Sequence, residues 1–213
     1  TESQQTLGQV ALTPKNVGAY TEFSRQLLMQ SNPAVDRLIM DDLAKVIGLA
    51  VDAAAINGSG ASGQPTGILN TAGIGSVSGT SLGYTGCMGL VSTLGTANAL
   101  DESGSVGFVT TPTVAALLMQ RQRFTSTDSP VWEGNLLDGT VAGLRAMSSN
   151  GMPSATMLAG NWQDLVIGEW GTLELMVNPF AQFSSNILGI RAIQTVDVGI
   201  RHAESFAKAA TIT

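Results

Sequence analysis

Residues suited to chemistry are scarce in this sequence, which has one histidine, His202, and one cysteine, Cys87. Catalytic triads and zinc sites need a histidine held against further partners. A cysteine near the start of a helix can have a lowered pKa, but a lone cysteine is more often a small buried apolar residue. We therefore expect His202 at the surface where a strand ends, Cys87 buried or half-buried, and no catalytic residue, metal or cofactor.

Two pairs of adjacent carboxylates also stand out, Asp41 with Asp42 and Asp101 with Glu102. Neighbouring side chains on a helix point about 100° apart, so neither pair is placed for joint acid and base catalysis. We expect solvated charges at these positions, or contacts with other chains.

A glycine motif, G-x-G-x-x-G, is formed by Gly58, Gly60 and Gly63. A dinucleotide-binding loop of this pattern follows a strand and opens a helix. Here a long predicted helix precedes the motif and Pro65 follows it. The pattern therefore favours a simple reversal from helix to strand.

The composition excludes some classes of partner. Charged residues make up only 12% of the 213 residues, and the formal net charge is −6. No basic stripe suited to phosphate binding is visible, since the densest basic pair is Arg121 and Arg123. The longest apolar stretch, residues 46–56, is interrupted by Asp52 and is shorter than the roughly 20 residues of a membrane span. A surface so poor in charge suits a protein covered largely by copies of itself.

One long amphipathic helix organises the chain, from residue 33 to about residue 57, and would be roughly 37 Å long. Ser31 and Asn32 provide an N-cap before Pro33. Met40 and Leu49 widen its apolar surface, so we expect some of these side chains to be more exposed than the pattern suggests. The predicted core stripe of this spine helix is Val35, Ile39, Leu43, Val46, Ile47 and Ala50.

The other predicted elements mix helices and strands without strict alternation, which favours an α+β fold. Helices are expected at residues 24–30, 87–100 and 112–124, and a loop at residues 68–84. Strands are expected at residues 10–23, 106–110, 141–147, 155–159, 173–177, 187–200 and 206–212. A strand and a helix of such length in one chain indicate an elongated region.

The order of these parts resembles a known family. A strand leads into S-R-Q-L-L, followed by a long helix that ends in A-I-N-G-S-G, the turn Q-P-T-G-I-L-N, the unit F-V-T-T-P-T-V-A-A-L-L-M-Q, and a late strand with N-I-L-G-I-R-A. From about residue 12 to residue 209, this is similar to the major capsid protein of tailed bacteriophages, the Hong Kong 97 type fold.

The resemblance implies an α+β capsid fold with a long spine helix, an elongated sheet in a peripheral (P) domain and a mixed axial (A) domain. It places residues 1–70 and 180–201 in the P domain, and residues 71–179 and 202–213 in the A domain. Family members carry an N-terminal arm and an extended loop before the point where this chain begins, so we expect a fragment or a processed product. Such a chain is expected to be able to stay monomeric in isolation.

The function implied is that of a structural subunit, not an enzyme. It would be made in the bacterial cytoplasm and would self-assemble with its own copies, as hexamers and pentamers, into the icosahedral head shell of a virion. The shell would enclose DNA of a phage or prophage without specific binding. One alternative is the shell protein of an encapsulin compartment. A hydrolase with a loop-based site is disfavoured, because the chain has no second histidine and no G-x-S-x-G motif.

Two further sets of residues follow from these interpretations. A cluster at a helix end and the loop after it is a candidate subunit contact, although a tryptophan folded onto its own core explains it equally well. This cluster is Arg121, Arg123, Phe124, Asp128 and Trp132. The resemblance also places Asn186 at the position of the asparagine that some family members cross-link to a lysine. The glutamate that promotes this bond would fall at Ile193, so we expect no cross-link.

Overall fold

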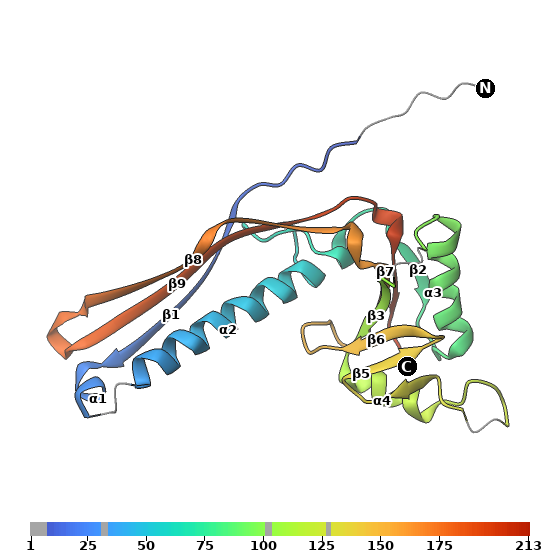
Figure 1. The fold of residues 1–213 in the computed structure, drawn as a ribbon, viewed down its shortest axis with the longest axis horizontal. Coiled ribbons are helices and arrows are strands. Elements are labelled where there is room, and N and C mark those ends of the chain that lie inside the picture. Colours follow the sequence, from blue (N-terminus) through green and yellow to red (C-terminus); the bar gives the residue numbers. More distant parts are fainter. Residues whose placement is uncertain (1–7, 31–33, 101–103, 127–128) are drawn as a thin grey trace.

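The computed structural model describes residues 8–30, 34–100, 104–126 and 129–213. It has an elongated part, in which a long helix underlies a narrow sheet, and a compact part built on a second sheet (Figure 1). The elongated part contains β1 (Lys15–Ser24), α1 (Arg25–Gln30), α2 (Ala34–Asn57), β8 (Leu165–Gln182) and β9 (Ile187–Ile200). The predicted α+β class is therefore confirmed.

The narrow sheet has the strand order β1-β9-β8, with both pairings antiparallel. Strand β9 pairs with β1 from Lys15 opposite Val196 to Ser24 opposite Ile187. Its other edge pairs with β8 from Leu165 onward. The predicted domain boundary at residue 180 thus cuts through β8, and the sheet places residues 165–179 with the elongated part. Sequence alone recognised only residues 173–177 as a strand.

Helix α2 packs one face on this sheet. Its buried side chains follow a spacing of four residues, and Ile39 at one end is half-buried. The buried set is Leu43, Ile47, Val51 and Ala55. The predicted stripe was wrong for Val46 and Ala50, which are exposed, because apolar residues lie on several sides of the helix and only the sheet selects one. The predicted excess exposure is confirmed for Leu49, at 69%, while Met40 is half-buried.

Residues 58–67 reverse the chain after α2, as the sequence predicted. The N–H of Gly67 donates to the carbonyl of Gly58 at 2.9 Å, and Ser59 pairs with Thr66 in an isolated bridge. A Cβ on Gly67 would lie 2.7 Å from the backbone nitrogen of Asn57. Glycine is therefore required at this point for the close approach of two backbone segments, and the glycines of the motif serve a turn.

The compact part is a mixed seven-stranded sheet in the order β2-β10-β7-β3-β6-β5-β4. Its strands are β2 (Gly75–Ser78), β3 (Val106–Thr110), β4 (Trp132–Gly134), β5 (Asp138–Val141), β6 (Leu144–Ser148), β7 (Met157–Asn161) and β10 (Phe206–Ala210). Its helices are α3 (Tyr84–Thr96) and α4 (Pro112–Gln120), and short 3-10 turns occur at Ile68–Asn70, Trp162–Asp164, Phe183–Ser185 and Ala203–Ser205.

Helices α3 and α4 cover one face of the compact sheet and form its core. The largest fully buried side chains there are Trp132, Phe108, Leu82, Leu90, Leu94, Leu118 and Met157. A smaller cluster on the opposite face joins the two parts. Ile56, near the end of α2, and Leu165, the first residue of β8, pack against it. The two parts therefore share a packed junction.

Candidate functional site

Within the part of the chain that the structure describes, the side chains best suited to chemistry are not gathered at one site. His202 is exposed after the end of β9, and Cys87 is fully buried in α3 against the compact core, as the sequence predicted for both. Burial raises the pKa of the Cys87 thiol to about 11, although its backbone hydrogen bond and Arg121 act in the opposite direction. Such a thiol is protonated and inert at neutral pH.

Acidic residues are equally dispersed. Asp41 and Asp42 are exposed on α2, and Asp42 forms an ion pair with Lys45 at 3.5 Å. Asp101 and Glu102 lie outside the described residues. Across the ranges that the structure describes, no three His, Cys, Asp or Glu side chains gather where they could hold a metal. Within the same ranges, each helix is too short or too polar to cross a membrane.

The predicted contact cluster after α4 is used largely inside the chain. The guanidinium of Arg121 donates to the carbonyl oxygens of Leu82 and Thr213, which fixes the chain end beside α3. Arg123 pairs with Glu133 at 2.6 Å and lies over the ring of Tyr84, 5.0 Å from its centroid. Both arginines therefore brace the fold within the chain.

The aromatic members of the cluster differ in exposure. Trp132 is 1% exposed and its indole N–H donates to the carbonyl of Asn135 at 2.8 Å, so its side chain cannot reach another subunit. The alternative, a tryptophan folded onto its own core, is the correct one. Phe124 is 59% exposed and packs edge-on against Tyr84 at 5.4 Å. Asp128 lies outside the described residues. A subunit contact stays a prediction for Arg121, Arg123, Phe124 and Asp128, and Phe124 is the described member with the most exposed side chain.

Asn186 lies where β8 and β9 meet, at the end of the elongated part. It is exposed and has a positive φ of 53°, which asparagine tolerates better than most residues. Its carbonyl accepts the N–H of Arg25 at 3.0 Å, which ties this turn to the start of α1. The residue therefore has a local structural role in addition to any role in assembly.

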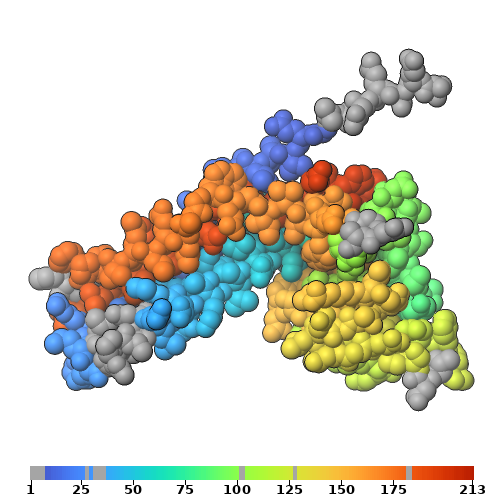
Figure 2. Space-filling view, viewed as in Figure 1, coloured from blue at the N-terminus to red at the C-terminus, as the bar shows by residue number. Residues whose placement is uncertain are grey.

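The most distinctive surface is apolar and lies on the elongated part. Large apolar side chains are exposed along α2 and β8, and β8 covers one face of this part in Figure 2. These side chains lie on more than one face, since neighbours such as Met176 and Val177 point to opposite sides of the sheet. Together we call them the exposed apolar surface: Leu38, Val46, Leu49, Trp170, Met176, Val177 and Phe180. Strand β8 is also an edge strand, so its outer backbone groups have no neighbouring strand within the described sheet. Exposed apolar groups beside an unpaired edge are typical of interaction surfaces.

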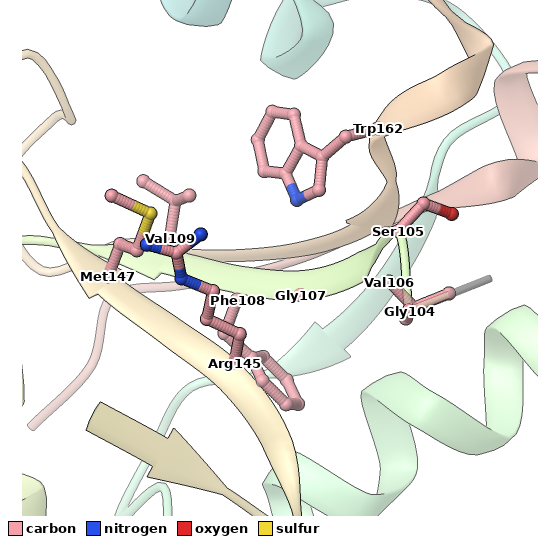
Figure 3. A pocket seen from close by; sticks show the side chains of 9 residues that line it. All are labelled: Gly104, Ser105, Val106, Gly107, Phe108, Val109, Arg145, Met147 and Trp162. Atoms are coloured by element: carbon pink, nitrogen blue, oxygen red, sulfur yellow. The ribbon is translucent and has the colours of Figure 1, made fainter. Parts of the chain in front are cut away.

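A second feature is a hollow of about 400 Å³ on the sheet face opposite α3 and α4 (Figure 3). Trp162 lies over the glycine at position 107, while Arg145 and Met147 from β6 line the other wall. Arg145 also pairs with the exposed Asp138 at 3.3 Å. The lining residues include no histidine or carboxylate, so the hollow cannot carry out acid–base catalysis. Sequence analysis missed it because its walls come from strands far apart in the chain.

Fold and surface together define the class: an α+β protein with exposed apolar residues on its elongated part and, among its described residues, no cluster of metal-binding or acid–base side chains. The sequence profile of the phage capsid family matches residues 1–210. The chain belongs to the phage capsid family. It is 26% identical over 206 residues to the major capsid protein of Halomonas phage phiHAP-1; the match covers 96% of this chain and 33% of that protein. The chain thus spans about a third of the length of this curated relative.

Solved structures show the same fold. The capsid of an empty GTA particle matches with a TM-score of 0.72 at 17% identity, covering 100% of this chain and 80% of that one. The SrpI encapsulin complex of Synechococcus elongatus PCC 7942 matches with a TM-score of 0.70 at 13% identity, covering 93% of this chain and 74% of that one. At these identities the likeness concerns the fold alone. The predicted Hong Kong 97 type fold is confirmed.

Proposed function

We propose that this chain is the structural part of a subunit that self-assembles into the icosahedral head of a tailed phage or prophage and encloses its DNA. The observation that carries the proposal is the exposed apolar surface of a chain from the phage capsid family. In water, these side chains expose apolar area that a neighbouring copy would remove at about 25 cal/mol per Å². Heterologous contacts of this kind close into rings and shells.

The two parts of the fold correspond to the two capsid domains in this proposal. The elongated part, including residues 165–179, is the P domain, and the compact part is the A domain. The chain acts by assembly and not by catalysis. It is made in the host cytoplasm and ends in the virion. Its acidic composition and its 10 basic residues suit DNA held by confinement, without specific phosphate contacts.

Electron microscopy of the protein, expressed alone at its natural length, tests this proposal. We expect closed shells of uniform diameter. The contents separate the two kinds of shell, since co-purified DNA supports the phage head and a single co-purified protein supports an encapsulin. Compact monomers under all assembly conditions would contradict both.

A matched pair on α2 tests the role of the exposed apolar surface. Leu49→Asp should leave folding intact but reduce the yield of shells at least about tenfold, because a charge would be desolvated in the contact. Lys45→Gln removes an exposed charge one turn away and should assemble like the parent protein, because exposed ion pairs contribute little. Equal shell yields for Leu49→Asp and Lys45→Gln would exclude Leu49 from the assembly contact.

A further inference from the structure

The segment before β1 crosses the narrow sheet without joining it. Residues 8–14 form no strand, and we call them the strap. Leu12 of the strap lies on two glycines of neighbouring strands: a Cβ on Gly168 of β8 or on Gly199 of β9 would be 2.8 Å from its methyl groups. A Cβ on Gly199 would also lie 2.7 Å from Val10. Real Cβ atoms do not approach this closely, so the strap sits where these two side chains are missing.

The register of the sheet places a carboxylate beside the two glycines. Gly168 pairs with Asp197, and Val166 pairs with Gly199, so all four residues share one face. Val196, the neighbour of Asp197, is buried on the other face with α2. The strap therefore lies on the side of the sheet away from α2, as the blue segment that leads into β1 shows in Figure 1. We call Gly168, Asp197 and Gly199 the seat.

Asp197 holds the strap by its backbone. The N–H of Thr13 donates to Oδ2 of Asp197 at 2.7 Å, and Nζ of Lys15 lies 3.3 Å from Oδ1. Asp197 is only 4% exposed, so its charge depends on these partners. The strap lacks the ladder of hydrogen bonds that secures β1. One carboxylate and two apolar contacts are few attachments, and such segments open locally at low free energy.

We propose that the seat is an intramolecular docking site whose contacts can open and close. When they are closed, the seat fixes the direction in which the chain before Lys15 leaves the sheet. Its occupant is the strap of the same chain. The glycines at positions 168 and 199 give room for Leu12 and Val10. The hydrogen bond from the N–H of Thr13 to Asp197 holds the strap close to the sheet. If the proposed function holds, docking of the strap on the seat decides which neighbouring subunit the residues before the strap can reach.

Hydrogen–deuterium exchange of the unassembled protein tests the seat directly. Gly199→Ala places a methyl group against Leu12 and Val10, and Asp197→Asn removes the charge that Thr13 meets. We expect amide exchange in residues 8–14 to rise about tenfold in both variants, as for the loss of one charge-assisted hydrogen bond. Amides of β9 should stay protected.

Two further variants keep the test decisive if a seat variant fails to fold. Leu12→Ala alters the strap and leaves the sheet untouched, and it should raise exchange at Thr13 to a similar extent. Gly18→Ala is the matched control, because its Cβ would meet its nearest atom at an ordinary 3.6 Å in the same sheet. The proposal that the strap docks on the seat would be overturned by an unprotected Thr13 amide in the parent protein. Equal exchange of the strap amides in Leu12→Ala and Gly18→Ala would overturn it as well.

The readout is independent of assembly. Faster exchange of the strap amides in Gly199→Ala, Asp197→Asn and Leu12→Ala supports docking of the strap on the seat even if the parent protein forms no shells. In that case only the proposed function fails. Normal shells with unchanged exchange in every variant would instead overturn the seat and keep the proposed function.

Discussion

The two parts of this chain bury their apolar residues to different degrees. The compact part encloses large aromatic and aliphatic side chains between its sheet and two helices. The elongated part has a thinner core, in which the buried cluster is Leu43, Ile47, Val51, Ile190, Ala192 and Val196. Its remaining large apolar side chains include many that face solvent on α2 and β8.

This difference indicates that the compact part is stabilised by its own core, whereas the elongated part depends more on contacts outside the chain. A layer of one helix on three strands can bury only one face of each, so the flanks of the helix and the part of the second sheet face beyond the strap stay uncovered. The compact part is more nearly complete, because α3 and α4 cover one face of its sheet and a smaller cluster covers part of the other face, beside the hollow under Trp162. The elongated part is therefore the region expected to gain most from contacts with other copies.

The largest effect is expected from a charge on the buried face of α2. Ile47→Asp should prevent soluble folding, because an unpaired carboxylate in the core costs several kcal/mol, a large share of a typical stability of about 5–15 kcal/mol. Leu49→Asp, two residues along the helix but 69% exposed, should change the free energy of unfolding by no more than about 0.5 kcal/mol. Solubility and circular dichroism melting check the pair. Cooperative melting of soluble Ile47→Asp would show that the wrong face has been assigned.

A pair of phenylalanines compares the two parts directly. Phe108→Ala in β3 should lower the free energy of unfolding by about 3–5 kcal/mol, because it leaves a cavity at a residue that is 1% exposed. Phe180→Ala in β8, where the ring is 71% exposed, should change it by no more than about 0.5 kcal/mol. Urea unfolding of both variants measures the difference. Similar losses in both would contradict a complete core in one part and an open surface in the other.

Elements with strong local signals were predictable from the sequence. Strand β9 was predicted to the residue, and α4 begins after Thr111, whose hydroxyl accepts the N–H of Val114 at 3.4 Å. The end of α2 before Gly58 follows from the same kind of reasoning. Capping residues and long regular patterns act within a few residues, so sequence reveals them without knowledge of the packing.

Features that depend on packing or on unusual turns were missed. Residues 141–147 were predicted as one strand, but Ala142 and Gly143 have φ values of 54° and 79° and turn the chain between β5 and β6. Alanine in a left-handed conformation gives no sequence signal for a hairpin. The length of β8 is likewise set by pairing with β9, which continues past Gly168 and, after a register shift, beyond Gly171. The exposed face of α2 and the burial of Trp132 depend on the partner surfaces in the same way.

The smallest expected effect concerns Asp197 and acid. Burial raises the pKa of this carboxyl, but hydrogen bonds from the amides of Thr13 and Val198, together with Lys15, outweigh burial and hold the pKa below its ordinary value. A lowered folded-state pKa contributes stability above the unfolded value of about 3.9 and loses it as the pH falls through the folded value. Asp197→Asn should therefore be less stable than the parent protein by about 1–2 kcal/mol at pH 7, with the gap closing at lower pH.

Urea midpoints of both proteins from pH 7 to pH 3 measure this gap. Every other carboxylate titrates in both proteins, so the difference isolates Asp197 and removes the general effect of acid on the fold. Asp138→Asn serves as the control in the compact part, because its ion pair with Arg145 is about 60% exposed on both sides and should give no resolvable gap at either pH. A gap for Asp197→Asn that stays constant down to pH 3 would mean that the pKa of Asp197 is the same in the folded and the unfolded protein, and that neither its charge nor that of Lys15 helps to hold the strap.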